Sequence, residues 1–441
     1  MDDWPEYPLG SFVDPKRSIC YGIVQPGKPR ERGVPIVRVN NFKEGRIDTR
    51  DALTINPEIE GKYQRSRLQG GELLLTLVGT MGLSAIVPNE LRGWNVARAV
   101  GVVPLKENVD KRWLNFVLRS QPSQDFIQTH ANTTVQATFN LRDLARLPIP
   151  MPPDDVRLPA SELLSALDDK IELNRRMNET LEAMARAIFK DWFVDFGPIR
   201  AKAEGSDPYL APELWDLFPD ALGDEDKPCG WPVQGLDEFV SLTKGRSYKS
   251  AELKDSDVAL VTLKSFERGG GYRRDGLKPY SGKYKPEQVV EPGELVVALT
   301  DVTQAADVIG KPAIVLEDDW YGTLVASLDV GIVRLRGSRV GLSFISQLLR
   351  TEQFQNHVYS HCTGTTVLHL SKDFLPTFKA CIPPVELAAW FEDTVAPISV
   401  RVAANAREGR TLAQTRDLLL PKLMSGEIRL REAEKAVEAV A

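Results

Sequence analysis

The chain repeats itself with a period of about 230 residues, and this repeat limits the folds that it can adopt. Trp4-Pro5 recurs as Trp231-Pro232, and Pro152-Pro153 recurs as Pro383-Pro384. Such a period is much longer than the roughly 20 to 50 residues of a solenoid or propeller unit. The sequence therefore predicts a duplicated domain, and each copy is followed by a segment with a helical pattern.

Each copy has the pattern of a mixed domain. Short runs rich in aliphatic and β-branched residues, such as 72–76 and 294–299, are bounded by glycine and proline, which is typical of strands. Helical patterns interrupt them near 113–127 and 342–358. We therefore expect each copy to fold as an α+β domain.

The segments that follow the two copies have the spacing of a coiled-coil seam. Apolar residues recur at alternating steps of three and four, interrupted at matching places by Asn174 and Asn405. A buried asparagine at a seam fixes the register at some cost in stability. A helix packed only on its own domain is the alternative, but two matching seams in one chain favour two long helices that pack on each other. Approximate twofold symmetry would make this pair antiparallel. The predicted seam residues are Leu164, Leu167, Ile171, Asn174, Leu181, Ile188, Val395, Ile398, Val402, Asn405, Leu412 and Leu419.

A proline-rich stretch separates the first helix from the second copy. It carries five prolines and the acidic run Asp224-Glu225-Asp226, so we expect a linker with one helical turn around 214–218. The predicted organisation is a first domain at 1–155, a long helix at 156–197, the acidic linker at 198–230, a second domain at 231–384, a second long helix at 385–430 and a tail at 431–441.

The net charge of -6 does not exclude nucleic acid as a partner, because the acidity is local. Residues 156–230 carry 9 basic and 16 acidic side chains, whereas residues 1–155 carry 20 and 18. A binding face can be basic within a nearly neutral domain. Four scattered cysteines fit a reducing compartment. The lack of a leader pattern or of an apolar run of about 20 residues predicts a cytoplasmic protein without membrane contact.

No catalytic motif stands out in the sequence. A phosphate-binding loop is absent, and Asp207-Pro208-Tyr209 lacks the second proline of the loop that holds a flipped adenine in methyltransferases. His357 and His361 have the spacing of zinc ligands on a helix, with Cys362 and His369 nearby, but the glutamate of the zinc-protease motif is missing. A metal site is therefore the less favoured interpretation. We predict a non-catalytic chain that binds no metal or cofactor itself.

Two basic, polar stretches occupy matching places in the two copies, at 28–46 and 264–285. Arginine and lysine suit phosphates and guanine edges, and asparagine suits adenine edges. A solvated surface is the simpler interpretation of either stretch alone, but their recurrence favours contact with DNA. The candidate DNA-binding residues also include two basic residues near 65 and threonines near the end of each copy. They are Lys28, Arg30, Arg32, Arg38, Asn40, Asn41, Lys43, Arg65, Arg67, Thr133, Thr134, Lys264, Arg268, Arg273, Arg274, Lys278, Lys283, Lys285, Thr365 and Thr366.

Three motifs resemble one protein family. The segment 167–193, which begins Leu-Asp-Asp-Lys-Ile-Glu-Leu-Asn-Arg-Arg and ends Phe-Lys-Asp-Trp-Phe, strongly resembles the central conserved helix of type I restriction-modification specificity (S) subunits. The segment 411–428 looks like their C-terminal conserved helix, and Thr363-Gly364-Thr365-Thr366-Val367 resembles the end of their target recognition domains. The resemblance covers essentially the whole chain.

This resemblance implies a non-catalytic protein with two target recognition domains, at 1–155 and 231–384, that each read one half of a split double-stranded DNA site. The two helices would act as a ruler between the half-sites. Two methyltransferase (M) subunits would dock on the helices and bring S-adenosylmethionine, while an endonuclease/translocase (R) subunit that uses ATP and Mg is a further candidate partner. Because recognition domains vary within the family, the DNA-contacting residues are not carried over. A non-catalytic protein-interaction scaffold is the alternative, and it predicts no salt-dependent affinity for duplex DNA.

Overall fold

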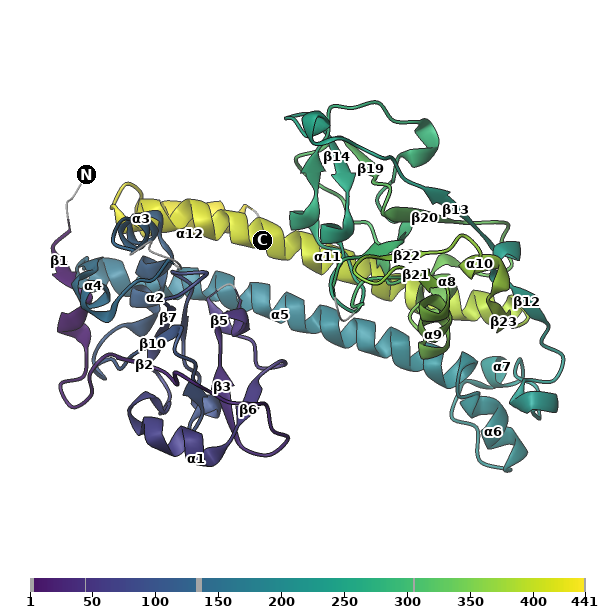
Figure 1. The fold of residues 1–441 in the computed structure, drawn as a ribbon, viewed down its shortest axis with the longest axis horizontal. Coiled ribbons are helices and arrows are strands. Elements are labelled where there is room, and N and C mark those ends of the chain that lie inside the picture. Colours follow the sequence, from purple (N-terminus) through teal and green to yellow (C-terminus); the bar gives the residue numbers. More distant parts are fainter. Residues whose placement is uncertain (1–3, 44, 132–136, 304–305, 440–441) are drawn as a thin grey trace. The chain divides into compact units, whose positions relative to one another are not determined.

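The chain folds into two compact units that share two long helices. The computed structural model describes residues 4–43, 45–131, 137–303 and 306–439. The first unit combines residues 1–175 with 407–441, and the second unit contains residues 176–406. Helices α5 (Asp154–Phe193) and α11 (Val385–Met424) have 40 residues each and contribute one half to each unit (Figure 1). Two globular blocks joined by helices were predicted, but the assignment of the C-terminal segment to the first unit was not.

The first unit is built around a four-stranded antiparallel sheet. Strand β7 is buried along its whole length, and its sequence Leu-Leu-Leu-Thr explains its central place, because only an inner strand covered on both faces tolerates such an unbroken apolar run. A second sheet pairs β3 with β6 antiparallel and with β9 parallel. The strands, in the order of their sheets, are β2 (Cys20–Tyr21), β10 (Val100–Val103), β7 (Leu73–Thr76) and β8 (Ser84–Ile86); β6 (Leu53–Ile55), β3 (Val34–Val37) and β9 (Asn95–Val96); β1 (Glu6–Pro8) and β11 (Pro148–Pro150); β4 (Phe42–Lys43) and β5 (Arg46–Ile47).

The second unit repeats this topology. Its four-stranded sheet has the order β13-β20-β16-β18, in which β16 takes the central place of β7. In its three-stranded sheet the central strand again has one antiparallel and one parallel neighbour. The strands are β13 (Val240–Lys244), β20 (Val330–Leu335), β16 (Leu295–Ala298) and β18 (Pro312–Ile314); β15 (Lys278–Pro279), β14 (Val258–Val261) and β19 (Thr323–Ala326); β12 (Val233–Gly235) and β23 (Lys379–Cys381); β17 (Thr300–Asp301), β22 (Leu368–Leu370) and β21 (Cys362–Thr363).

Each predicted helical stretch consists of two consecutive helices. In the first unit, the side chain of Asp110 accepts hydrogen bonds at the start of α2, and Pro122 lies in the first turn of α3, where a missing N–H costs nothing. In the second unit, Thr351 caps α9 in the same way that Asp110 caps α2. The shorter helices are α1 (Pro57–Glu60), α2 (Lys111–Arg119), α3 (Gln121–Thr129), α4 (Leu141–Arg146), α6 (Gly197–Ala203), α7 (Pro212–Trp215), α8 (Leu342–Leu348), α9 (Glu352–Ser360), α10 (Phe374–Thr377) and α12 (Leu430–Glu438).

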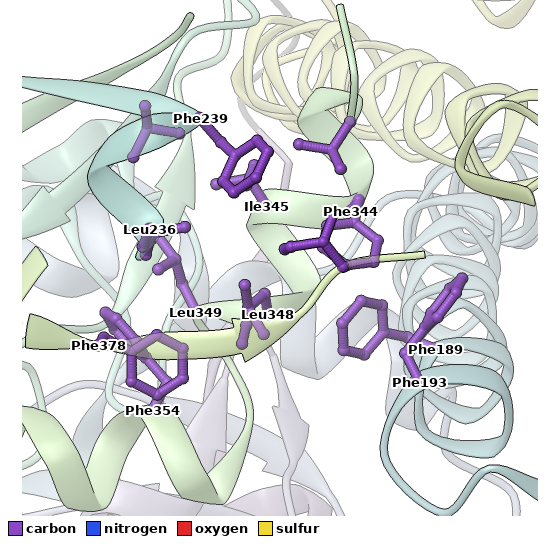
Figure 2. Packing of buried hydrophobic residues seen from close by; sticks show 14 of the residues in the cluster. Phe189, Phe193, Leu236, Phe239, Phe344, Ile345, Leu348, Leu349, Phe354 and Phe378 are labelled. Atoms are coloured by element: carbon purple, nitrogen blue, oxygen red, sulfur yellow. The ribbon is translucent and has the colours of Figure 1, made fainter. Parts of the chain in front are cut away.

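Aromatic side chains fasten the second unit to its halves of the long helices. Phe189 and Phe193 of α5 pack against Phe344 of α8 with ring centroids 5.3 and 5.1 Å apart (Figure 2). Phe391 of α11 joins the same cluster, 5.2 Å from Phe193. Rings at these separations and steep angles make edge-to-face contacts in addition to burying apolar area. The corresponding core of the first unit is mainly aliphatic and includes residues from the start of α5 and the end of α11.

The segment predicted as an acidic linker is packed into the second unit. Ile199 of α6 and Phe218 after α7 are 0% and 1% exposed, and the ring of Phe218 lies 5.8 Å from that of Trp192. Lys202 donates a hydrogen bond to the carbonyl of Phe218 at 2.6 Å. The prolines misled the sequence prediction, because the apolar residues between them supply a buried face. The predicted C-terminal tail likewise contains α12, whose Ala433 is fully buried.

The predicted α+β class with an internal repeat and two long antiparallel helices is confirmed. In the first unit the beginning of α5 packs with the end of α11, and in the second unit the end of α5 packs with the beginning of α11. No helix in the described part of the chain combines the length and the apolar composition needed to cross a membrane.

Candidate nucleic-acid interface

The predicted seam residues lie in the cores or at the margins of their units. In the first unit Leu164, Leu167, Leu412 and Leu419 are 3% exposed or less, and Ile171 is half-buried. In the second unit Val395 is 1% exposed, while the others are half-buried, namely Leu181, Ile188, Ile398 and Val402.

The two seam asparagines have different partners. Asn174 donates to Glu408 Oε2 at 3.0 Å in the first unit, and Asn405 donates to Asn178 Oδ1 at 2.8 Å in the second unit. Both side chains are 2% exposed or less, and each has a buried carbonyl oxygen without a hydrogen-bond partner in the described structure. The long helices are therefore joined at these positions by two separate polar contacts, one within each unit.

The basic stretch of the first unit lies on an exposed loop and a short hairpin. The loop between β2 and β3 carries Lys28, Arg30 and Arg32, and all three side chains are exposed. Asn40 and Lys43 are exposed at the hairpin formed by β4 and β5. These five residues form the first basic surface.

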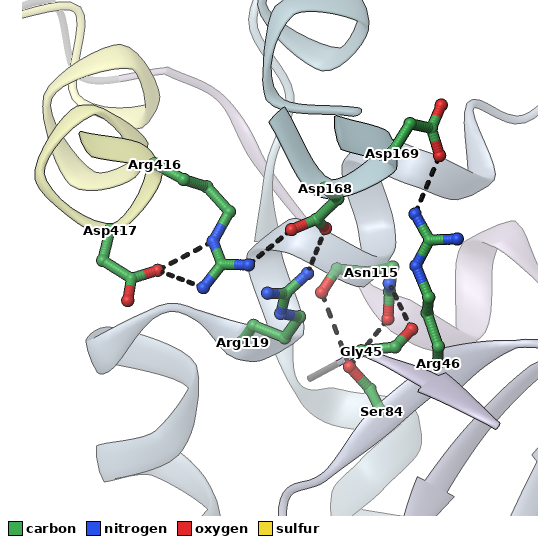
Figure 3. Close-up of polar contacts among 9 residues, drawn as sticks. All are labelled: Gly45, Arg46, Ser84, Asn115, Arg119, Asp168, Asp169, Arg416 and Asp417. Atoms are coloured by element: carbon green, nitrogen blue, oxygen red, sulfur yellow. Dashed lines mark hydrogen bonds and ion pairs between the residues drawn. The ribbon is translucent and has the colours of Figure 1, made fainter. Parts of the chain in front are cut away.

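Polar contacts anchor the hairpin of the first basic surface to helix α5. Arg46 forms an ion pair with Asp169 at 2.8 Å, and Asn115 of α2 donates to the carbonyl of Gly45 at 3.5 Å (Figure 3). Ser84 in turn donates to Asn115 Oδ1 at 2.8 Å. The hairpin is thus held between the sheet and the helix, which fixes the position of Lys43 beside it.

A second contact in the same region centres on Asp168 of α5. Its two oxygens bind Arg119 of α2 at 2.7 Å and Arg416 of α11 at 2.5 Å, and Arg416 also contacts Asp417 at 2.8 Å (Figure 3). Burial opposes the charge of Arg416, but the ion pairs with Asp168 and Asp417 raise its pKa. Arg416 occupies a seam position where the pattern calls for an apolar residue, and this departure was the only sequence signal of the contact.

Three candidates in the first unit have side chains that are bonded within the domain. Asn41 is 2% exposed, donates to the carbonyl of Asp48 at 2.9 Å and accepts from the Arg38 amide. Arg38 donates from its guanidinium to the carbonyl of Asp51 at 2.7 Å. Arg67 forms two hydrogen bonds with Glu60, which is 2% exposed. These three side chains stabilise the domain, and we leave them out of the proposed interface.

The ion pair of Arg67 compensates a buried carboxylate. The hydrogen bond from Arg67 holds the pKa of Glu60 below its usual value, against the opposing effect of burial, and Asn95 adds a further bond at 3.0 Å. A buried carboxylate needs such partners. Arg65 differs, because its side chain is exposed and donates a hydrogen bond to the Ser18 hydroxyl at 2.7 Å instead of pairing with a carboxylate.

The basic stretch of the second unit divides in the same way. Lys264, Lys283 and Lys285 are exposed, and Arg268 is 81% exposed with Asp307 3.8 Å away. These four residues form the second basic surface. The other candidates, Arg273, Arg274 and Lys278, lie close to other side chains of the second unit.

Arg273 and Lys278 have partners within the second unit, whereas Arg274 has acidic residues nearby but a buried Nη1 without a hydrogen-bond partner among the described residues. Arg273 forms an ion pair with Asp275. Burial lowers the pKa of Arg274, and acidic residues at 317–319 provide the opposing attraction. Lys278 lies over the ring of Tyr248, 5.7 Å from its centroid. We therefore give them no part in the proposed interface.

The threonine motif of the second unit forms an exposed turn between β21 and β22. Gly364 has φ of +103°, and a Cβ there would lie 2.1 Å from the Val367 carbonyl, so the turn requires glycine. Thr365 and Thr366 are exposed at its tip. The corresponding candidates of the first unit, Thr133 and Thr134, lie outside the described residues.

The histidine pair is held by backbone carbonyls. His357 donates from Nε2 to the carbonyl of Phe374, and His361 donates from Nδ1 to the carbonyl of His357, each at 2.9 Å. In the described ranges no group of three potential metal ligands comes together. The less favoured metal interpretation gains no support from this arrangement.

Comparison with known proteins finds similarity to one family. A model described as the type I restriction modification DNA specificity domain matches residues 1–183. The type I restriction enzyme HindI specificity subunit of Haemophilus influenzae is 22% identical over 480 residues, which cover 97% of this chain and 100% of that protein. Over nearly its whole length the chain is therefore similar to type I restriction-modification specificity subunits. The resemblance predicted from the sequence motifs is thereby confirmed.

Two further matches extend this result. The EcoBI specificity subunit of Escherichia coli is 30% identical over 190 residues, covering 43% of this chain and 37% of that protein. The crystal structure of a type I restriction-modification S subunit from M. genitalium shares the fold, with a TM-score of 0.53 over 95% of this chain and 96% of the other at 14% identity. The role expected for this chain, DNA sequence specificity rather than catalysis, agrees with the names of the proteins that it resembles.

Proposed function

We propose that this chain reads a bipartite double-stranded DNA target, with one half-site bound by each unit. The observation that carries the proposal is the duplication: two units of the same strand order each present exposed basic side chains next to the three-stranded sheet. In the first unit they lie mainly before β3, and in the second unit they lie after β14 and β15. Lysine and arginine on such loops suit phosphates and guanine edges. The proposed contacts are Lys28, Arg30, Arg32, Asn40, Lys43 and Arg65 in the first unit and Lys264, Arg268, Lys283, Lys285, Thr365 and Thr366 in the second.

The similarity to type I specificity subunits supports binding of DNA together with partner subunits. We propose that two methyltransferase subunits dock on the long helices and supply S-adenosylmethionine for an adenine in each half-site. A shallow groove of about 610 Å³ on α11 supports such docking. Its lining combines Ala396, Pro397, Val400 and Ala404 with the charged Asp393 and Arg401, and Val400 is 69% exposed. An endonuclease subunit would bring ATP and Mg, whereas this chain holds no cofactor. The complex would act in the cytoplasm.

Methylation sequencing of the source genome tests the proposal. Wild-type cells and cells that lack this chain are compared base by base. Loss of N6-methyladenine at one split motif is the expected result, and the motif gives both half-sites. An unchanged methylome in cells that express the chain and its partners would contradict it.

A protein-interaction scaffold without DNA affinity remains the competing function. It is distinguished by the affinity of the assembled complex for duplex DNA over a range of salt concentrations. Phosphate contacts make the logarithm of the affinity fall steeply with the logarithm of the salt concentration. A complex that binds no duplex at low salt would favour the scaffold.

A further inference from the structure

The two units carry arginines at equivalent positions. Arg119 ends α2 and Arg350 lies just before α9. A few residues after each arginine lies a glutamine, and the two glutamines donate to equivalent backbone carbonyls. Gln124 and Gln355 both donate to a glycine and to a leucine carbonyl. These acceptors are Gly82 and Leu118 in the first unit, and Gly310 and Leu349 in the second. The repeated pattern fixes the correspondence between the two arginines.

The two arginines differ in their counter-ions. Arg119 is paired with Asp168 at 2.7 Å. Asp168 follows seam residue Leu167, and the residue that follows the matching Ile398 is Ser399, which carries no charge. The second unit therefore retains the arginine but lacks the carboxylate that neutralises it in the first.

A lysine lies next to the unneutralised arginine. Lys311 follows Gly310, at the place where Leu83 follows Gly82 in the first unit. A Cβ placed on Gly270 would lie 3.4 Å from Arg350 Nη1 and 3.6 Å from Lys311 Cβ. Both cationic residues are thus adjacent to the glycine turn that carries Arg268 of the second basic surface.

Acidic side chains lie near both cations, namely Glu182 and Glu267 near Arg350 and Asp307 near Lys311. Glu182 is 3.5 Å from Arg186, and Asp307 is 3.8 Å from Arg268. Within the described ranges the side chains of Arg350 and Lys311 form no ion pair and no hydrogen bond. Burial lowers the pKa of both residues, and the neighbouring arginine lowers that of Lys311 further. Two half-buried cations that form no ion pair of their own favour binding of an anion.

We propose that Arg350 and Lys311 form a binding site for a phosphate of the DNA backbone. The inference rests on the proposed function and adds a contact that the basic stretches did not contain. The DNA backbone is the favoured source of the phosphate because Arg268, on the same glycine turn, is 81% exposed within the second basic surface. In the first unit the equivalent arginine serves to hold the domain on the long helices.

The test compares R350Q and K311Q with the wild type in the fully assembled complex. Affinity for the duplex identified by methylation sequencing is measured over a range of salt concentrations. Each neutralised phosphate contributes about one unit to the slope of log affinity against log salt, so each variant is expected to reduce the slope by about one. K379Q is the matched control, since Lys379 is exposed on β23 outside both basic surfaces, and its slope should equal that of the wild type.

Thermal melting with added inorganic phosphate separates the two sources of the anion. Unchanged slopes in both variants overturn the proposal. If the slopes are unchanged and added inorganic phosphate raises the melting temperature of the wild type but not of the variants, the site binds a free anion instead. If the R350Q variant fails to assemble, the salt dependence of K311Q still tests the proposal, because Lys311 is only half-buried. A wild-type complex that binds no duplex at any salt concentration would instead overturn the proposed function itself.

Discussion

At the scale of single residues, the basic side chains divide according to the partners that the fold brings to them. Arg67 and Arg273 have acidic partners seven and two residues away, which a reader of the sequence could suspect. Arg46 finds Asp169 at a separation of 123 residues, and Arg416 finds Asp168 at 248. Composition shows that a stretch is basic, but only the fold shows which charges remain available for DNA.

Asp168 supports two arginines, so its neutralisation should be costly. In D168N, Arg119 loses its carboxylate and Arg416, only 8% exposed, keeps Asp417 alone. Removing one partner of a buried ion pair costs about 3 kcal/mol or more, because the remaining charge stays buried. We expect chemical denaturation to show a loss of that order.

The neighbouring residue provides the control. Asp169 is 74% exposed and pairs with Arg46 at the surface, and such pairs contribute about 1 kcal/mol or less. D169N should therefore denature almost like the wild type. Equal losses of unfolding free energy in D168N and D169N would show that the contact at Asp168 does not hold the unit together.

At the scale of elements, local patterns were sufficient where a segment follows a single period. The runs 72–76 and 294–299 are the central strands β7 and β16, and the seam pattern marks α5 and α11. The segment 198–230 was misjudged, because its buried residues are irregularly spaced between prolines and gain their core only from the second unit. The hydrogen-bond partners of Asn174 and Asn405 could also not be predicted from the sequence, because a shift of one turn between the two helices changes these partners.

The seam asparagines should limit the stability of the helix pair. Each has a buried carbonyl oxygen without a partner, and such a group costs about 1 kcal/mol or more. We expect N174L and N405L each to raise the melting temperature, because Glu408 retains Lys170 at 3.2 Å and Asn178 is half-buried, within reach of water. The double variant should be more stable still and hold its register less strictly.

Asn178 serves as the matched control at the same helix pair. It donates to the Val402 carbonyl at 3.1 Å and accepts from Asn405, so it uses both ends of its amide. N178L should lower the melting temperature. If N174L and N405L lower it as well, the unpaired oxygens are not the limiting feature.

At the scale of the whole molecule, the period of about 230 residues predicted two similar folds, and the strand orders agree. The division into units follows a different boundary, because residues 407–441 join the first unit through Leu412, Leu419 and Leu423. The seam spacing marks Leu412 and Leu419 as apolar contacts, but it does not show which unit they join. The long helices therefore belong to both units, and the boundaries fall within them near residues 175 and 406.

This boundary is where the proposed ruler can be lengthened. Insertion of one heptad between Arg175 and Arg176 and another between Ala406 and Arg407 preserves the seam spacing and leaves each unit intact. Seven helical residues add about 10 Å, or about three base pairs of duplex. Methylation sequencing should then show the same two half-sites with a spacer about three base pairs longer. Seven residues inserted after Gly205, between α6 and α7, should leave the spacer unchanged. An unaltered spacer in the double-heptad variant would mean that the helices do not set the distance between half-sites.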